Sequence, residues 1–425
     1  MSGELHNIQS LVVGMEKSGQ AAAAFLLDQG AQVTTTDLKP QQAPGFRLQT
    51  DELFAEPWNL IVLSPGVPAD LPALDAARAR GIRVIGEVEL AAPYLKGPVI
   101  GITGTNGKTT TTALTGHILQ TTGVPVQVGG NIGTPVIAMT ATSRTDQWNV
   151  LELSSFQLET IETFRAHIAI CLNVTQNHLD RHHTSANYAE AKSWLFRTQL
   201  PGDHAILNAN DETCRSFAAL TKARVEWFSG TEIETLMPPA DVPLRGSHNA
   251  ENIMAAAAAA HLVGINKPAI AAAVKTFKAV EHRLEFVTEI NGVSFYNDSK
   301  ATSVDATIKA LDSFDVNLWV ILGGKDKGSD YTVLRERLRH KAHAALLIGS
   351  AAPKIAEQLE GATPLIHSET LDRAIEDAWA KSGPGDTVLL APACASFDQF
   401  QSFEHRGRHF KELVHNLERS NGKNS

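Results

Sequence analysis

A glycine-rich loop followed by a lysine and a threonine is the part of this sequence best suited to chemistry. It reads GITGTNGKT at 101–109, after the apolar pair Val99-Ile100 and before a threonine-rich segment that predicts a helix. Glycines let backbone N–H groups cradle an oxyanion at a helix N-terminus. We expect Lys108 to reach the outer phosphates of a nucleotide and the Thr109 hydroxyl to bind Mg²⁺. The spacing departs from the strict G-x4-G-K-[ST] pattern, because Ile102 stands where its first glycine belongs.

Two further polar residues follow apolar runs that predict strands. Glu152 comes directly after the run at 149–151, and burying an unpaired carboxylate is costly, so a metal role is favoured over a structural salt bridge. His178 lies a few residues after the run at 168–172, on the side where the phosphates should lie. A zinc site is disfavoured because no compact set of ligands surrounds it. We interpret His182 and His183 as solvated loop residues.

Length and composition limit the classes of protein. At 425 residues the chain is too long for one ordinary core, and its net charge of −9 argues against binding to nucleic acid or an anionic membrane. Its three cysteines are far apart in sequence, which favours reduced, buried thiols. The N-terminal residues do not resemble a secretion signal, and no run of 18 apolar residues predicts a membrane span. A cytoplasmic protein is the expectation.

Strands and helices are predicted to alternate along the whole chain. Alternation of this kind implies mostly parallel sheets that bind ligands at the carboxyl ends of their strands. The predicted helices include 20–28 and the alanine-rich 252–262. The predicted strands are 10–13, 32–36, 59–63, 99–100, 149–151, 168–172, 204–207, 318–322, 344–348 and 387–391. Breaks near 91–98 and 280–283 predict three consecutive α/β domains at 1–92, 93–280 and 281–425.

Two other nucleotide-binding classes fit the sequence poorly. A GTPase needs an Asn-Lys-x-Asp segment to read guanine, but Asn266-Lys267 runs on into Pro268-Ala269. The segment GMEKSG at 14–19, with Asp37 23 residues after Gly14, imitates a dinucleotide fingerprint. It lacks G-x-G-x-x-G, so a nicotinamide site is a weak interpretation.

Taken together, the motifs resemble those of the Mur ligase superfamily along nearly the whole chain. The family's loop is built as G-x-x-G-x-x-G-K-[ST], so Gly101, Gly104 and Gly107 fit and the departure noted above disappears. The other matching segments are LELSSFQLE at 151–159, NVT at 173–175, HLDR at 178–181, YAEAK at 188–192, His248-Asn249 with Asn252, His282-Arg283 and NDSKAT at 297–302. The segment PACASFDQF at 392–400 resembles the D-glutamate-adding branch, and no DNPR-type motif of the diaminopimelate- or lysine-adding branches is present.

The resemblance implies a fold and a reaction. The fold is a Rossmann-like UDP-binding domain, a central P-loop ATPase domain with a mostly parallel sheet, and a C-terminal Rossmann-like domain. The implied reaction uses ATP to convert the carboxylate of UDP-N-acetylmuramoyl-L-alanine into an acyl phosphate, which the amine of D-glutamate then attacks. This reaction belongs to bacterial peptidoglycan precursor synthesis. Because two anions meet in its first step, clamping by cations is expected to carry much of the catalysis.

The resemblance also assigns site residues by position. Its catalytic set is Lys108, Glu152, His178, Lys192 and Lys300. ATP is expected to contact Gly104, Thr105, Asn106, Gly107, Lys108, Thr109, Thr110, Asn252, Arg283 and Asp298. Two Mg²⁺ ions are implied, one at Thr109 and Glu152, the other near His178 and a carbamylated Lys192. The UDP-linked substrate is expected at Met15, Lys17, Asp37, Lys39, Ser64, Gly66 and Asn131. D-Glutamate is expected at Thr302, Lys327, Ser396 and Phe403.

Two lysines illustrate what the residues alone leave open. On composition, Lys192 on an alanine-rich helix would be a solvated charge, and only the resemblance supports its carbamylation, which needs a neutral amine. Lys325 adds a cation two residues before Lys327, so either lysine could face the side-chain carboxylate of D-glutamate.

Three competing functions remain at this stage. One is a folylpolyglutamate-type ligase, disfavoured because such chains lack the N-terminal layer predicted here. The others are a nicotinamide oxidoreductase using the first layer, and an NTPase switch that hydrolyses without ligation. We expect a monomer with no nucleic-acid partner, and a hinge near residues 278–284 that lets the domains close before chemistry.

Overall fold

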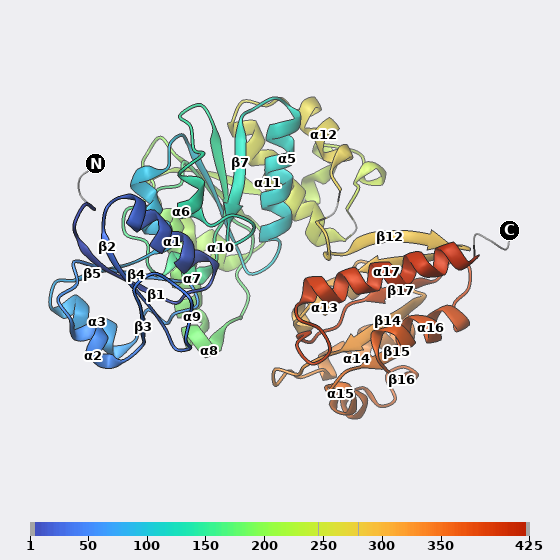
Figure 1. Ribbon diagram of the computed structural model, residues 1–425. Helices are drawn as coiled ribbons and strands as arrows, with labels where there is room; N and C mark the ends of the chain where they lie inside the picture. Colours follow the sequence, from blue (N-terminus) through green and yellow to red (C-terminus); the bar gives the residue numbers. More distant parts are fainter. Residues whose placement is uncertain (1–4, 245, 279, 422–425) are drawn as a thin grey trace. The chain divides into compact units, whose positions relative to one another are not determined.

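Contacts between Cα atoms divide the chain into two units. The computed structural model describes residues 5–244, 246–278 and 280–421 (Figure 1). The first unit comprises the described residues up to Asp241 together with Glu251–Thr276. The second comprises the described residues of Val242–Ala250 and those from Phe277 onward.

A five-stranded parallel sheet forms the N-terminal layer of the first unit, with the order β3-β2-β1-β4-β5. Its strands are β1 (Gln9–Val13), β2 (Gln32–Asp37), β3 (Phe46–Leu48), β4 (Leu60–Leu63) and β5 (Arg83–Gly86). Its helices are α1 (Lys17–Asp28), α2 (Asp51–Ala55), α3 (Pro72–Ala79), α4 (Glu87–Ala91) and the 3₁₀ turn η1 (Ala92–Tyr94). Val13 lies beside both Thr36 and Leu63, so the loops after β1, β2 and β4 meet at one edge.

Helix α1 begins three residues earlier than the sequence predicted. The expected turn at 14–19 is shorter, because the helix already includes Gly19. A Cβ atom on Gly19 would lie 1.8 Å from the carbonyl oxygen of Gly14, so only glycine lets the helix start this close to the end of β1.

A six-stranded parallel sheet forms the central layer of the first unit, with the order β11-β10-β9-β6-β8-β7. Its strands are β6 (Val99–Thr103), β7 (Val126–Gly130), β8 (Trp148–Glu152), β9 (Ile168–Cys171), β10 (His204–Asn208) and β11 (Arg224–Phe228). Its α-helices are α5 (Lys108–Thr121), α6 (Val136–Met139), α7 (Ser155–Leu158), α8 (Leu179–His182), α9 (Ser185–Arg197), α10 (Glu212–Ser216), α11 (Ser247–Leu262) and α12 (Lys267–Thr276). The 3₁₀ turns are η2 (Phe217–Ala219), η3 (Gly230–Thr235) and η4 (Pro239–Asp241).

The register of the central sheet brings the predicted functional loops together. Ile102 in β6 pairs with Glu152 in β8, and Thr103 pairs with Cys171 in β9. Because the three strands run parallel, the loops that follow them leave the sheet at the same edge.

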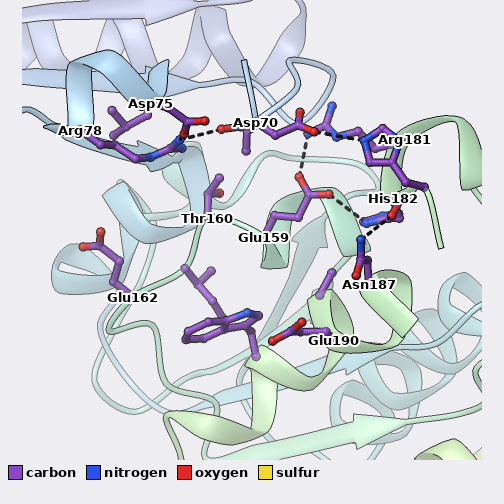
Figure 2. A pocket seen from close by; sticks show the side chains of 16 residues that line it. Asp70, Asp75, Arg78, Glu159, Thr160, Glu162, Arg181, His182, Asn187 and Glu190 are labelled. Atoms are coloured by element: carbon purple, nitrogen blue, oxygen red, sulfur yellow. Dashed lines mark hydrogen bonds and ion pairs between the residues drawn. The ribbon is translucent and has the colours of Figure 1, made fainter. Parts of the chain in front are cut away.

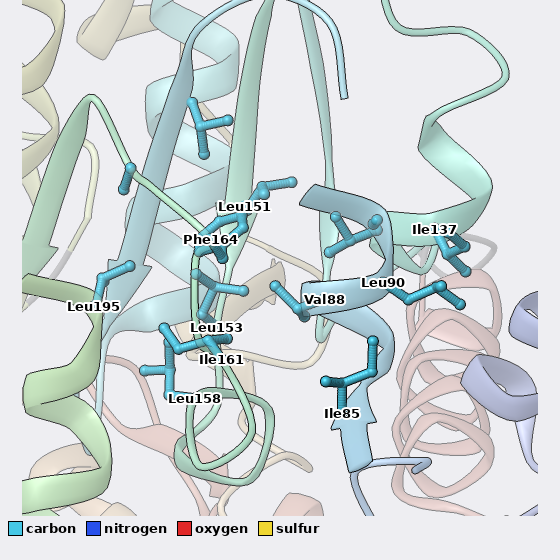
Figure 3. Close-up of a cluster of buried hydrophobic side chains, with 14 of the residues drawn as sticks. Ile85, Val88, Leu90, Ile137, Leu151, Leu153, Leu158, Ile161, Phe164 and Leu195 are labelled. Carbon is cyan, nitrogen blue, oxygen red and sulfur yellow. The ribbon is translucent and has the colours of Figure 1, made fainter. Parts of the chain in front are cut away.

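The two layers of the first unit share one core. Ile85, Val88 and Leu90 of the first layer belong to the same buried cluster as Leu151 and Phe164 of the central layer. Fully burying side chains of this size contributes about 1.5–3 kcal/mol each. A cavity of about 510 Å³ nevertheless remains between the layers, lined by residues of α3 and α9 among others (Figure 2). Figure 3 shows the side chains that both layers contribute to the shared core.

The second unit contains a six-stranded sheet of order β12-β13-β17-β14-β15-β16, in which only the β12–β13 pair is antiparallel. Its strands are β12 (Glu285–Ile290), β13 (Val293–Asn297), β14 (Leu318–Gly323), β15 (Ala342–Ile348), β16 (Leu365–Glu369) and β17 (Thr387–Leu390). Its helices are α13 (Val304–Asp312), η5 (Thr332–Leu334), α14 (Arg335–Lys341), α15 (Ala352–Leu359), α16 (Leu371–Lys381) and α17 (Phe403–Asn421).

The predicted α/β architecture is confirmed, and every predicted strand overlaps an observed one. Cys171, Cys214 and Cys394 are buried and unbridged, as expected. Among the described residues, no helix combines the length and the apolar character needed to cross a bilayer.

Candidate active site

The glycine loop joins the end of β6 to the N-terminus of α5. Gly104 and Gly107 have φ angles of 150° and 86°, which favour glycine. At Gly107 a side chain is also excluded by space, because a Cβ atom would lie 2.2 Å from Oδ1 of Asn252 in α11. Thr111 of α5 donates to the same Asn252 oxygen over 3.3 Å. Asn252 therefore packs directly against the loop, beside the predicted nucleotide site.

The loop is held in shape by the segment that follows β9. The N–H of Thr105 donates to the carbonyl of Asn173 over 2.8 Å, and the N–H of Asn106 donates to the Asn173 side chain over 2.9 Å. The Thr105 hydroxyl exchanges hydrogen bonds with the backbone of Thr175 and accepts one from Tyr188. A loop fixed by so many bonds is preorganised for phosphate.

Lys192 is buried against the glycine loop. This corrects the expectation from composition that Lys192 is a solvated charge. Its side chain is 1% exposed, its Nζ donates to the carbonyl of Gly104 over 2.9 Å, and Nζ lies 4.5 Å from the centre of the Tyr188 ring. Burial, and then the nearby charge of Lys108, hold the pKa of Lys192 well below its usual value, while Glu152 opposes this. The neutral amine that carbamylation requires is thereby favoured.

Glu152 offers a buried oxygen to a cation. Asn131 donates to its Oε1 over 2.9 Å, and the residue is 2% exposed. The other oxygen, Oε2, is buried and accepts no hydrogen bond from any residue that the structure describes. An unsatisfied buried carboxylate oxygen is costly, and a hard cation would satisfy it. Glu152 and the buried Thr109 therefore fit the chemistry of a Mg²⁺ site.

His178 and His182 differ in burial. His178 is exposed, has a left-handed backbone with φ of 51°, and precedes α8, with its ring 5.0 Å from that of Phe156. His182 was expected to be solvated, and this is wrong: it is 5% exposed. Its Nε2 lies 3.0 Å from the Ser155 hydroxyl and its Nδ1 lies 3.2 Å from Glu159. The prediction failed because these partners come from a distant segment. His183 is exposed, as expected.

The residues expected to bind the UDP-linked substrate lie around the carboxyl edge of the first sheet. Asp37 accepts hydrogen bonds from the backbone N–H groups of Met15 and Lys39, so its carboxylate shapes these turns. Lys17 donates to the carbonyl of Gly133, which brings the first layer to the loop that carries Asn131. The hydroxyl of Ser64, two residues before Gly66, is buried and has no hydrogen-bond partner among the described residues.

Two predicted nucleotide-binding residues lie in the second unit: Arg283 precedes β12, and Asp298 follows β13. Asp298 accepts a hydrogen bond from the Leu284 N–H over 3.2 Å. Burial raises its pKa to about 7, although that hydrogen bond and the charge of Arg283 oppose the rise. The Nζ of Lys300 lies 3.8 Å from the centre of the Phe403 ring, and Ser299 donates to the Phe403 carbonyl.

The loop after β14 and the segment after β17 are joined by their backbones. Lys325 and Ala395 form an antiparallel bridge, so the predicted Lys327 and Ser396 lie on neighbouring segments. Asp326 is held by Lys354 at 2.8 Å and by the Tyr331 hydroxyl at 2.8 Å. Thr302 follows Lys300, and its N–H donates to the Lys300 carbonyl. Ser299 donates to the Phe403 carbonyl and the Ala301 N–H donates to the Asp298 carbonyl, so the predicted positions 298, 300, 302 and 403 are connected around these two residues.

Sequence reasoning missed the buried Arg406. It is 1% exposed and donates to the Ser299 backbone and hydroxyl and to the Cys394 carbonyl. Burial lowers its pKa to about 10. An arginine in a polar helix segment looks solvated, and no local pattern marks it.

The large cavity of Figure 2 is not the predicted site, because none of its lining residues belongs to the glycine loop.

Comparison with known proteins places this geometry in a family. In chain order, residues 8–86 match the MurD-like N-terminal domain of Mur ligases, 102–237 the Mur ligase middle domain, and 282–394 the Mur ligase glutamate ligase domain. A protein of Solibacter usitatus named UDP-N-acetylmuramoylalanine–D-glutamate ligase is 62% identical, over 98% of this chain and 99% of its own length. The chain belongs to the Mur ligase family.

Other Mur ligases agree with this assignment. A protein of Acidobacterium capsulatum with the same name is 49% identical over 97% of both chains. Among solved structures, a MurF ligase of Thermotoga maritima in complex with ADP superposes with a TM-score of 0.61 at 15% identity, covering 98% of this chain and 97% of its own. A UDP-N-acetylmuramate–alanine ligase of the same organism has a TM-score of 0.60 at 16% identity, with 97% and 100% covered. As a Mur ligase, the chain is an ATP-dependent ligase.

Proposed function

We propose that this chain joins D-glutamate to UDP-N-acetylmuramoyl-L-alanine through an acyl phosphate made from ATP, giving ADP and phosphate. The observation that carries the proposal is the 62% identity with the Solibacter ligase over nearly the full length of both chains. The three domains proposed for these tasks are 1–92, 93–280 and 281–425.

In the first step, the acceptor carboxylate attacks the γ-phosphorus of ATP, and the bond to the β-phosphate oxygen breaks. The loop amides from Gly104 to Thr110 and the Lys108 ammonium would neutralise the phosphates, which otherwise repel the incoming anion. Two Mg²⁺ ions, one at Thr109 and Glu152 and one at His178 and carbamylated Lys192, would supply further positive charge. Asn252, Arg283 and Asp298 are proposed to hold the nucleotide.

In the second step, the amine of D-glutamate attacks the acyl carbon, phosphate leaves, and the amine loses a proton. Lys300 is proposed to stabilise the negative charge that develops. Thr302, Lys327, Ser396 and Phe403 are proposed to bind D-glutamate, with Lys325 as the alternative cation. The UDP-linked acceptor is proposed to lie along Met15, Lys17, Asp37, Lys39, Ser64, Gly66 and Asn131.

One assay tests the function. Purified protein receives ATP, Mg²⁺, UDP-N-acetylmuramoyl-L-alanine and single amino acids, and phosphate release is followed with each component left out in turn. We expect release only with acceptor and D-glutamate together. Release that ignores both would instead indicate an NTPase, and oxidation of NADH with a simple keto acid would indicate an oxidoreductase. The cytoplasmic location and the monomeric state stay predictions.

A further inference from the structure

One carboxylate in the wall of the large cavity joins three segments of the first unit. Glu159 follows α7, the short helix after the strand that carries Glu152. Its Oε2 accepts a hydrogen bond from Arg181 over 2.8 Å, and its Oε1 lies 3.2 Å from Nδ1 of His182 (Figure 2). The three side chains are only 16%, 11% and 3% exposed, so the cluster is shielded from solvent.

Arg181 extends this cluster to the first layer. The nitrogen that donates to Glu159, Nη2, also donates to the carbonyl of Val67 over 2.8 Å. The guanidinium lies 5.0 Å from the centre of the Phe156 ring, which fixes its plane. A planar guanidinium with several donors can hold two acceptors in a defined geometry, which an ammonium does less well.

Val67 belongs to the turn that carries two proposed acceptor-binding residues. Its N–H donates to the carbonyl of Ser64, and Gly66 precedes it. Val67 also packs against Gly14, where a Cβ atom would lie 2.7 Å from the valine side chain. Through Val67, Arg181 is therefore connected to the turns after both β1 and β4.

The backbone of Arg181 lies in α8, the helix that directly follows His178. The backbone N–H groups of Arg181 and His182 both donate to the His178 carbonyl, at 3.1 and 2.9 Å. Fixing the side chains of Arg181 and His182 on Glu159 thus fixes the position of His178 relative to Glu152.

We infer that Arg181 is a positioning residue for the UDP-linked acceptor, because it fixes the position of the Ser64–Val67 turn relative to the loop that carries His178. This inference rests on the proposed function and deepens it. Arg181 touches neither the acceptor nor ATP in this assignment, and it acts through Val67 and Glu159.

The same cavity offers a matched control. Arg78 lines it and also donates to one carbonyl, that of Ala69 at 2.8 Å, and to one carboxylate, that of Asp75 at 2.7 Å. Both partners lie in the first layer, so among the described residues these bonds do not connect Arg78 to the central layer. Loss of the Arg78 side chain should change the cavity wall without changing the position of the Ser64–Val67 turn relative to the loop that carries His178.

The test compares Arg181→Met with Arg78→Met in the full chain. For Arg181→Met, the KM for UDP-N-acetylmuramoyl-L-alanine should rise about tenfold, well within the ~100-fold that a 1 Å misplacement costs. The KM values for ATP and D-glutamate should change less than about twofold, and Arg78→Met should leave all three near wild type. Calorimetry of acceptor binding without ATP should show the same weakening. An unchanged acceptor KM in Arg181→Met would overturn the inference.

Two further variants separate positioning from stability. Removing Arg181 leaves Glu159 buried without its cation, which destabilises the fold. The double variant Arg181→Met/Glu159→Gln removes that charge, so its Tm should recover while its acceptor KM stays raised. Recovery of both would mean a purely structural role and would overturn the inference. If Arg181→Met does not fold, Arg181→Lys carries the comparison. Wild-type protein that fails to ligate overturns the proposed function as well, whereas active wild type with an unchanged variant overturns the inference alone.

Discussion

Lys108 and Lys192 donate to the same carbonyl oxygen, that of Gly104, each over 2.9 Å. Two cations that share one acceptor repel each other, and the fully buried one loses its charge more easily. Burial and the charge of Lys108 lower the pKa of Lys192, so Lys192 is the amine that a carbamate would modify. Such a modification would turn the repulsion between them into attraction.

The first prediction concerns this modification. Carbamylation adds CO₂ to a neutral amine with release of a proton, so a lysine with a lowered pKa reacts at lower pH than an ordinary one. Lys192→Ala should lose most of the ligase activity, by about 100-fold or more. Added formate or acetate should restore part of it by replacing the carboxylate. The same anions should not rescue Lys108→Ala, and full activity in Lys192→Ala would exclude the carbamate.

The second prediction concerns Glu152→Gln. The amide keeps the size of the side chain and can still accept from Asn131, but it removes the negative charge that the buried oxygen offers to a cation. We expect kcat to fall about 100- to 1,000-fold, in the range found when one electrostatic contact to a transition state is lost. The Mg²⁺ concentration for half-maximal activity should also rise. A variant with wild-type Mg²⁺ dependence would show that Glu152 holds no metal.

The third prediction compares the two glycines that flank α5, Gly107 before it and Gly123 after it. Gly107 and Gly123 have similar φ angles, 86° and 81°, so alanine is strained at both. Only at Gly107 would the new methyl collide, with Asn252; at Gly123 no atom lies within 4 Å. Gly107→Ala should raise the KM for ATP at least tenfold, whereas Gly123→Ala should lower stability by about 1 kcal/mol and leave that KM unchanged. Equal KM values would contradict a nucleotide at this loop.

The fourth prediction concerns the pH dependence of stability. Glu87 is 2% exposed, and burial raises its pKa to about 7, although it accepts a hydrogen bond from the Ile137 N–H. Between pH 4.5 and 7 the folded state binds a proton that the unfolded state has released, so stability falls as pH rises through this window.

Glu87→Gln should remove that contribution. The slope of unfolding free energy against pH should change by up to about 1.4 kcal/mol per pH unit in the same window. Urea titrations at several pH values measure the slope, and ligase activity should stay near wild type. Burial also raises the pKa of Asp298 to about 7, but its contribution to the slope is the same in wild type and Glu87→Gln and therefore cancels in the comparison. Parallel pH curves for the two proteins would refute the prediction.

The fold and the local motifs were predictable because their signals are short in sequence. The glycine loop, its preceding strand and the acid at the end of β8 each depend on neighbours within a few residues. The strands that were not predicted are β3, β5, β7, β11, β12, β13 and β16. Three of them carry weak signals: β3 has three residues, β7 ends in two glycines, and β12 pairs with β13 around an irregular register. Short or irregular strands are fixed by their partners, which local propensity does not contain.

Burial of charged residues was the part that the sequence could not predict. Lys192, His182 and Arg406 all lie on helices whose own composition suggests solvent exposure. Their hydrogen-bond partners are Gly104, Ser155 and Ser299, which are 27 to 107 residues away in the chain. Only the tertiary fold brings such pairs together.

The shared core of the first unit has a practical consequence for dissecting the protein. The carboxylate of Glu89 in α4 accepts hydrogen bonds from the backbone N–H groups of Glu162, Thr163 and Phe164. A fragment that begins at residue 93 would lose this support and expose the apolar side chains of the central layer that share one core with Val88 and Leu90 (Figure 3). The central layer is therefore not a free-standing module, and shortened versions of this enzyme should retain the first layer.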